Sequence, residues 1–526
     1  MYKGVRITCK KRIGLFLCIS CSVVALSALN VSAADLYDRI EPVNPLEIRT
    51  APDTMVISVP KRAALTHNDV HNHYAIAFDR FVQSNVKSAY SNFRVLIETI
   101  VPNDYAYMLM AENMADIGLF NLSGLAMSKI DDKDVTNVLS DDIKRYYFPS
   151  KKLKVEDEIY LGEVYSNIIY NDQSREAAAE LIKNTALLAD SDYANYVAAL
   201  GYLKSGNAQE AEKYINIALG MNPQNINYKK LYAEIVAQGK KPQNALKIVE
   251  DIKQQRLYSV DFSNKVNSLE QYILYKTKKN EIQKMYHLGY YYYCENELHK
   301  SARTLQGALS GNIRGKKSIN ADVYALLARV YFDMNEFEKA QDTAAKAYKL
   351  KRDDPVILLV LGDLRYREKD YKGALRYYED AHDKNSWIPA IKAAQTYQML
   401  NKEKKAAEVY DKVLKNFSDA YLAYYNVALK DKTKEIPYLK KALALNMAFK
   451  DGWIDLGRVE TERRNFAAAK KYLQIAYYID ENDFRYYYYQ GLLFKNQGLK
   501  EDAQSSFRKS LILNPDYAPA KEEISI

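Results

Sequence analysis

Glycine and proline are scarce in this chain, with 19 and 13 residues among 526. Both residues interrupt helices, so their scarcity leaves long stretches free to be helical. Apolar residues make up 48% of the chain, which excludes a disordered tail and provides side chains for a sizeable core. Because the chain is long for one compact core, we expect several domains or a repeat array that grows without a central core.

Cysteine is almost absent beyond the first 33 residues, where Cys294 stands alone. One cysteine cannot form an internal disulfide, so stability must come from packing. The sequence shows no neighbour that would lower the pKa of the Cys294 thiol. We therefore expect an ordinary buried thiol.

Signatures of catalysis are absent too. The chain has no G-x-S-x-G, H-E-x-x-H or G-x-x-x-x-G-K motif, and no C-x-x-C after residue 33. Its carboxylates stand at helical spacing from Lys and Arg, which is typical of a solvated helix face. We predict that the chain is not an enzyme and needs no cofactor.

One histidine cluster is the exception to weigh. His67 and His71 are four residues apart and could bind a transition metal with Asp69 or His73. Alternatively, Asn68 or Asp69 caps the first helix and the histidines are exposed. We favour this second interpretation and predict no metal. A catalytic unit within residues 34–157 that uses these histidines is the enzyme alternative.

The charge balance excludes nucleic acid as a partner. The formal net charge is +9, and it falls to +4 without the five basic residues among the first 33. We find no run of Lys and Arg interleaved with aromatic residues at the density of a nucleic-acid-binding stripe.

Residues 1–33 have the pattern of a signal peptide. Lys10, Lys11 and Arg12 form a basic region, and an apolar stretch follows from Ile13 to Leu29. The small residues up to Ala33 suit signal peptidase, so we expect cleavage after Ala33 and an exported, periplasmic or secreted protein. An uncleaved anchor and a lipoprotein acylated at Cys21 are the alternatives. No later stretch is long and apolar enough to span a membrane.

Residues 34–69 contain four prolines and no apolar periodicity, so we expect a partly disordered linker. After this linker, helical periodicity continues almost to the end of the chain. The strongest signal is a repeat of about 34 residues. Ala328 and Gly362 are 34 positions apart, as are Gly457 and Gly491, and each lies between aromatic residues and a later group of alanines.

The pattern resembles the tetratricopeptide repeat family, in which a pair of antiparallel helices is the repeating unit. A small residue such as Gly362 lets the second helix approach the first, and stripes of apolar residues oblige neighbouring pairs to stack. We therefore predict an all-α, right-handed superhelical solenoid of about a dozen helix pairs. A generic α-solenoid, such as a Sel1-like array, is the alternative, and the fixed spacing favours tetratricopeptide repeats.

The repeat pattern is more regular in some parts of the chain than in others, and this difference suggests how the chain is divided. We expect divergent repeats over residues 70–257 with an insertion near 135–157, an insertion or degenerate unit over 258–281, regular repeats over 282–518 and a tail over 519–526. The unit from Tyr421 to Asn446 is short.

In the family, the first helix of each pair lines a concave surface, and the positions beside the small residue point inward. The resemblance implies that eleven residues line this partner-binding groove: Tyr196, Tyr286, Tyr290, Tyr293, Arg329, Phe332, Asp363, Tyr366, Arg458, Tyr488 and Leu492. Tyrosine is common at binding interfaces. Alternatively, the rings fill the superhelix by packing on one another.

These features predict an exported scaffold that binds a protein or peptide partner on its concave face, in cell-envelope assembly or secretion. The identity of the partner is unknown, and association with the envelope is compatible with the prediction. The alternative is a factor associated with glycan or polysaccharide export, because aromatic faces also stack on sugar rings.

Overall fold

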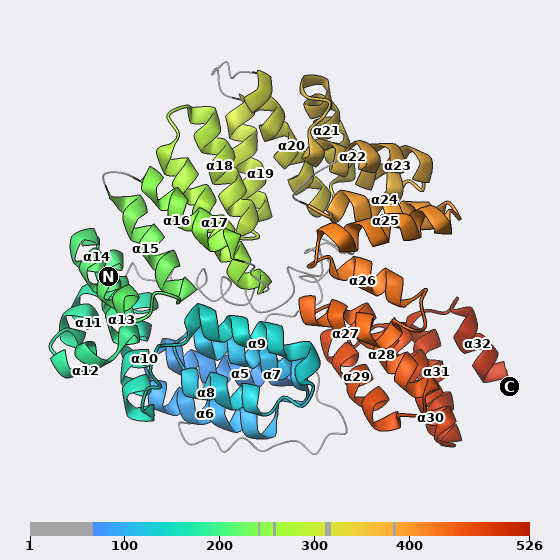
Figure 1. Ribbon diagram of the computed structural model, residues 1–526, viewed down its shortest axis with the longest axis horizontal. Coiled ribbons are helices and arrows are strands. Elements are labelled where there is room, and N and C mark those ends of the chain that lie inside the picture. The colour runs from blue at the N-terminus through green and yellow to red at the C-terminus, as the bar shows by residue number, and fades with distance from the viewer. Residues whose placement is uncertain (1–66, 240–241, 256–258, 311–316, 382–385, 526) are drawn as a thin grey trace, which may run out of the picture. The chain divides into compact units, whose positions relative to one another are not determined.

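The computed structural model describes residues 67–239, 242–255, 259–310, 317–381 and 386–525. In these ranges the chain forms 28 helices and no strand, which confirms the all-α prediction (Figure 1). The predicted signal peptide and most of the predicted linker lie outside the described residues. No described helix combines the length and the apolar character that crossing a bilayer requires.

The chain divides into two compact units. The central unit contains Lys229–Val427, and the terminal unit contains Pro42–Tyr228 together with Ala428–Ile526. The terminal unit is therefore built from two segments that lie far apart in the sequence. Two helices, α15 (Ile226–Gln238) and α26 (Tyr421–Ala428), cross the boundaries between the units.

The first segment of the terminal unit contributes ten complete helices: α5 (His67–Val82), α6 (Val86–Thr99), α7 (Asp104–Asp116), α8 (Phe120–Ser128), α9 (Lys133–Tyr147), α10 (Val155–Ile169), α11 (Ser174–Leu181), α12 (Thr185–Asp190), α13 (Asp192–Lys204) and α14 (Ala208–Met221). The second segment contributes α27 (Glu435–Leu445), α28 (Lys450–Glu462), α29 (Phe466–Ile479), α30 (Phe484–Asn496), α31 (Lys500–Leu513) and α32 (Ala518–Ser525).

The central unit contributes α16 (Gln243–Gln254), α17 (Val260–Thr277), α18 (Glu281–Cys294), α19 (Leu298–Ser310), α20 (Lys317–Asp333), α21 (Phe337–Leu350), α22 (Pro355–Arg367), α23 (Tyr371–Asp380), α24 (Ile388–Met399) and α25 (Glu403–Asn416). The predicted regular repeats correspond to packed pairs in both units, among them α20 with α21 and α30 with α31.

Small residues bring the two helices of a pair together, as the repeat pattern predicts. A Cβ atom added to Gly362 would lie 2.5 Å from the ring of Tyr378 on the second helix. The same addition at Gly491 would lie 2.5 Å from the ring of Phe507. Neither position has room for a larger residue unless the second helix moves.

The turn between the helices of a pair is also repeated. In each turn one residue has a positive φ: Asn335 (59°), Lys369 (62°), Arg464 (61°) or Gly498 (80°). The amide that follows donates to a carbonyl five residues earlier, as Glu336 does to Tyr331 at 2.9 Å. This arrangement satisfies a carbonyl at the end of the first helix and reverses the chain toward the second.

The irregular stretches of the sequence are helical as well. Residues 135–157 hold most of α9 and the start of α10, and residues 258–281 hold α17. Helix α17 packs between α16 and α18, whereas α9 packs against α7 and α27. Residues 519–525 of the predicted C-terminal tail lie within α32, which packs on α31, and residue 526 lies outside the described residues.

Candidate binding surface

All eleven predicted groove residues lie on first helices, but they are divided between the two units. The central unit holds seven of them: Tyr286, Tyr290 and Tyr293 on α18, Arg329 and Phe332 on α20, and Asp363 and Tyr366 on α22. The terminal unit holds Tyr196 on α13, Arg458 on α28, and Tyr488 and Leu492 on α30.

Tyrosines of α18 form a continuous row along the helix. The ring centroids of Tyr286 and Tyr290 are 6.1 Å apart, and those of Tyr290 and Tyr293 are also 6.1 Å apart. All three rings pack against a core cluster that includes Leu326 and Phe332 of α20. One side of the row is therefore held by the core, and the rings are fixed before any partner arrives.

The other side of this row is accessible. Within α18 only Ile282 and Gly289 are buried, and the tyrosines are half-buried. Burial raises the pKa of Tyr290 to about 12, so its hydroxyl stays protonated at neutral pH. The row thus presents neutral rings with hydroxyl tips, which suits contact with a peptide or another apolar surface.

Arg329 is tied to two carboxylates beside this row. Its guanidinium lies 2.8 Å from Asp333 and 3.3 Å from Asp363, and the Tyr293 hydroxyl donates to Asp333 at 2.8 Å. Arg329 and Asp363 are 34 residues apart and occupy equivalent positions in successive repeats. Their ion pair therefore joins neighbouring first helices, α20 and α22.

Asp363 is the centre of this network, and its side chain is only 1% exposed. It also accepts a hydrogen bond from the Tyr378 hydroxyl at 2.7 Å and lies 2.6 Å from Lys392 on α24. The carboxylate thus has three partners from three different helices. We infer that Arg329 and Asp363 mainly hold the surface together, because their charges are already compensated.

Sequence reasoning missed three members of this network. Asp333 is four residues after Arg329, a helical spacing that could have identified it. Tyr378 and Lys392 come from the second helix of one repeat and the first helix of the next. Their convergence on Asp363 depends on how the helices stack, and no local pattern marks it.

Arg458 has a comparable environment in the terminal unit. It lies 2.7 Å from Glu435, 3.0 Å from Asp455 and 2.8 Å from Glu462. Burial by itself lowers the pKa of Arg458, but the hydrogen bonds of Glu435 and Glu462 raise it overall. The guanidinium is therefore permanently charged and already paired with carboxylates.

The remaining predicted residues differ in exposure. Tyr196 is only 7% exposed and stacks on Tyr228 at 5.0 Å, and Phe332 is also only 7% exposed. Tyr366, Tyr488 and Leu492 are half-buried. Tyr196 and Phe332 can therefore offer a partner little surface, whereas the other three can contribute to a contact.

Cys294 is the last residue of α18, and its thiol is shielded by burial. Burial raises the pKa of the Cys294 thiol to about 12, so the thiol is protonated at neutral pH. In the part of the chain that the structure describes, no three His, Cys, Asp or Glu residues are arranged to hold a metal ion. The side chains of His67 and Asp69 lie outside that part, and burial lowers the pKa of His71.

Comparison with known proteins supports the repeat family. The tetratricopeptide repeat model matches residues 196–256 and residues 326–386. The matched segments contain α14, α15, α16, α21, α22 and α23 and parts of α13 and α20. No protein in the curated comparison matched the sequence.

Several solved structures resemble the chain at low identity. A chain of the APC/C hetero-tetramer Cut9-Hcn1 is 12% identical with a TM-score of 0.42, over 88% of this chain and 96% of that chain. The MamA protein is 26% identical with a TM-score of 0.26, over 31% of this chain and 93% of that chain. YrrB, described as a tetratricopeptide protein with an unusual peptide-binding site, is 17% identical with a TM-score of 0.25, over 43% of this chain and all of that chain.

Proposed function

We propose that the chain is an exported scaffold that binds a protein or peptide partner on the surface formed by α18, α20 and α22. In this proposal it acts in cell-envelope assembly or secretion and works without catalysis. The half-buried tyrosine row of α18 carries the proposal. Export is supported by the signal-like pattern of residues 1–33 alone.

The chemistry of the surface favours a partner with apolar or aromatic anchors. Aromatic rings supply contact area at low entropic cost, and those of α18 already rest on the core. Because Arg329 and Lys392 are paired with carboxylates, neither provides an uncompensated charge for a strongly acidic ligand. We therefore expect recognition by packing and by hydroxyl hydrogen bonds.

The test is affinity capture with the full chain, followed by mass spectrometry, using the wild type and a Tyr290→Ala variant. Tyr292→Ala is the matched control, because Tyr292 is a half-buried tyrosine of the same helix outside the predicted groove. Circular dichroism checks that both variants keep the helical fold.

A protein partner that is retained by Tyr292→Ala and lost with Tyr290→Ala supports the proposal. Equal capture by both variants would mean that the row of α18 is not the binding surface. Recovery of glycan in place of protein would favour the polysaccharide-export alternative, in which the tyrosine rings stack on sugars.

A further inference from the structure

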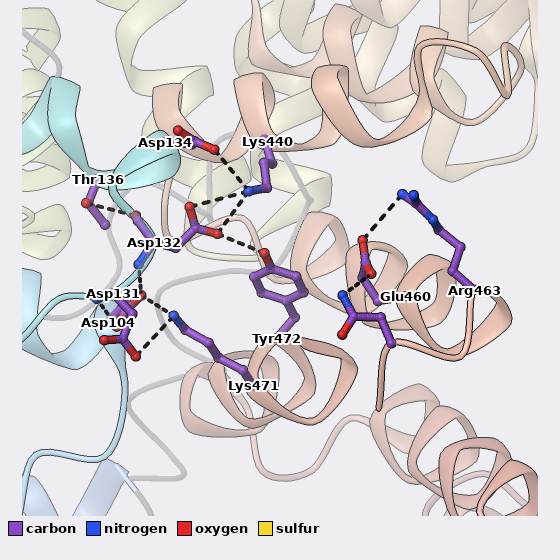
Figure 2. Close-up of polar contacts among 11 residues, drawn as sticks. Asp104, Asp131, Asp132, Asp134, Thr136, Lys440, Glu460, Arg463, Lys471 and Tyr472 are labelled. Carbon is purple, nitrogen blue, oxygen red and sulfur yellow. Dashed lines mark hydrogen bonds and ion pairs between the residues drawn. The ribbon is translucent and has the colours of Figure 1, made fainter. Parts of the chain in front are cut away.

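Two irregular parts of the repeat pattern meet inside the terminal unit. Helix α9 comes from the predicted insertion, and α27 comes from the predicted short unit. The two helices pack against each other, and α29 packs against α7 (Figure 2). The contacting residues are separated by more than 300 positions, as in the 308 between Asp132 and Lys440.

Two lysines reach from the second segment to acidic residues of the first. The Lys440 ammonium of α27 lies 3.3 Å from the Asp132 carboxylate and 3.3 Å from that of Asp134. The Lys471 ammonium of α29 lies 2.9 Å from Asp104 and 3.5 Å from Asp131 (Figure 2). Each lysine therefore bridges two carboxylates near the start of α7 or α9.

The side chain of Asp132 does not cap the helix that it precedes. It precedes α9 as the N-cap residue, where an Asp side chain normally accepts a hydrogen bond from the first turn, yet it makes no such bond. Its carboxylate instead accepts from the Tyr472 hydroxyl of α29 at 2.8 Å. The carboxylate of Asp104 accepts from the backbone amides of Asp131 and Asp132 at 3.2 and 2.9 Å, which orders the chain before α9.

Two of the four carboxylates that contact the two lysines are largely buried. The side chains of Asp104 and Asp132 are 4% and 10% exposed, so the solvent screens their ion pairs only partly. The rings of Tyr105 and Tyr478 meet edge to face beside them, with centroids 6.2 Å apart. Loss of the lysines would leave two buried carboxylates without a compensating charge, which is costly.

We propose that these contacts form a clasp, in which the acidic residues before and within the first turns of α7 and α9 recognise Lys440, Lys471 and Tyr472 of the same chain. The clasp holds α27 onto α9 and α29 onto α7 in solution. Helices with few neighbours open most easily. By adding α27 and α29 to the neighbours of α7 and α9, the clasp slows the opening of these helices.

The test measures hydrogen exchange by mass spectrometry in the full chain, with the variant Lys440→Glu/Lys471→Glu. Both substitutions lie in the second segment, and the readout is the exchange of residues 104–147 in the first. We expect amides of α7 and α9 to exchange about tenfold faster, because the opening that exposes them becomes easier. Circular dichroism should show unchanged helix content.

The matched control is Lys441→Glu/Lys470→Glu. These exposed lysines are the immediate neighbours of the clasp lysines on the same two helices, so the charge change is identical. We expect exchange in residues 104–147 to equal that of the wild type. A similar acceleration in the control would refute the clasp in favour of a general charge effect.

Two more variants keep the test decisive if the double reversal folds poorly. Tyr472→Phe removes one hydrogen bond without changing charge, and it should accelerate exchange of α9 by a smaller factor. Asp132→Lys combined with Lys440→Glu restores an opposite-charge pair and should recover protection relative to Lys440→Glu alone. Wild-type exchange in Tyr472→Phe, together with no recovery in the charge swap, would overturn the proposal.

Discussion

Helices α13 and α18 are both tyrosine-bearing first helices of a repeat, yet they are used in opposite ways. In α13, eleven of the 13 residues are buried, whereas in α18 only Ile282 and Gly289 are buried among 14. Helix α13 contacts α10, α11, α12 and α14, and α18 contacts α17, α19 and α20. The short helices α11 and α12 give α13 neighbours that regular repeats do not provide.

The comparison teaches that neighbours, and not residue types, decide which first helix remains available for binding. Tyr193 of α13 is 3% exposed and meets Phe120 at a centroid distance of 4.7 Å. Tyr290 of α18 has similar chemistry but keeps one side accessible. The same side chain is therefore a core residue in one repeat and a surface residue in another.

Truncation of the two tyrosines should produce the largest difference. Tyr193→Ala removes a fully packed ring, and we expect a loss of about 3–5 kcal/mol in the free energy of unfolding. Tyr290→Ala should cost about half as much or less, because part of the ring is already exposed. Thermal and urea unfolding followed by circular dichroism would measure both. Equal losses of stability in the two variants would show that Tyr193 and Tyr290 are packed equally well.

Glycine substitution should give the next largest contrast. An added Cβ at Gly201 of α13 would lie 2.7 Å from the Cβ of Ala178 and 3.0 Å from the backbone oxygen of Ser174. At Gly289 of α18 the three nearest atoms would all belong to the side chain of Leu305, the first of them at 2.7 Å. We expect Gly201→Ala to cost about 1–3 kcal/mol and Gly289→Ala to cost less. The same unfolding measurements apply, and the reverse order would show that α18 is the tighter helix.

Removal of a single tyrosine hydroxyl should change the stability of the protein in opposite directions in α13 and α18. The buried hydroxyl of Tyr193 has no hydrogen-bond partner among the described residues, so Tyr193→Phe should be neutral or stabilise the protein by up to about 1 kcal/mol. The hydroxyl of Tyr293 donates to Asp333, so Tyr293→Phe should destabilise it by about 1 kcal/mol or more. Shifts in the unfolding midpoint with opposite signs would confirm the distinction, and a loss in both variants would contradict it.

The dependence of stability on pH also differs between the two regions, and its sign is opposite in them. Burial raises the pKa of Glu158, on α10 beside α13, to about 7, so its contribution to stability is present below pH 4.5 and is lost as pH rises toward 7. Burial lowers the pKa of His287 on α18 to about 4, so its contribution is present above pH 6.5 and is lost as pH falls toward 4.

Melting temperatures of the wild type, Glu158→Gln and His287→Gln between pH 4 and 7.5 would test both pH dependences. Relative to Glu158→Gln, the wild type should lose stability as pH rises. Relative to His287→Gln, it should lose stability as pH falls. A difference that does not change with pH would show that the group concerned does not titrate differently on folding.

The sequence predicted some of the candidate site through its periodicity. The placement of Tyr290, Arg329 and Asp363 on first helices followed from the spacing of the small residues, and Arg329 and Asp363 stand at equivalent positions 34 residues apart. The approach of Lys392 to Asp363 could not be predicted, because it depends on the stacking of a third first helix. The burial of Tyr196 likewise depends on Tyr228 of α15, whose ring stacks on that of Tyr196 at a centroid distance of 5.0 Å. This contact forms only when α15 stacks on α13.

By itself the sequence determined the all-α class, the pairs of helices and the close contacts at residues such as Gly362. These features are local, since they follow from helical periodicity, small residues and turns within about 34 positions. The tertiary structure alone decided which tyrosines stay accessible, how Asp363 is surrounded and where α9 meets α27. Those features depend on packing between segments far apart in the chain, which no local pattern records.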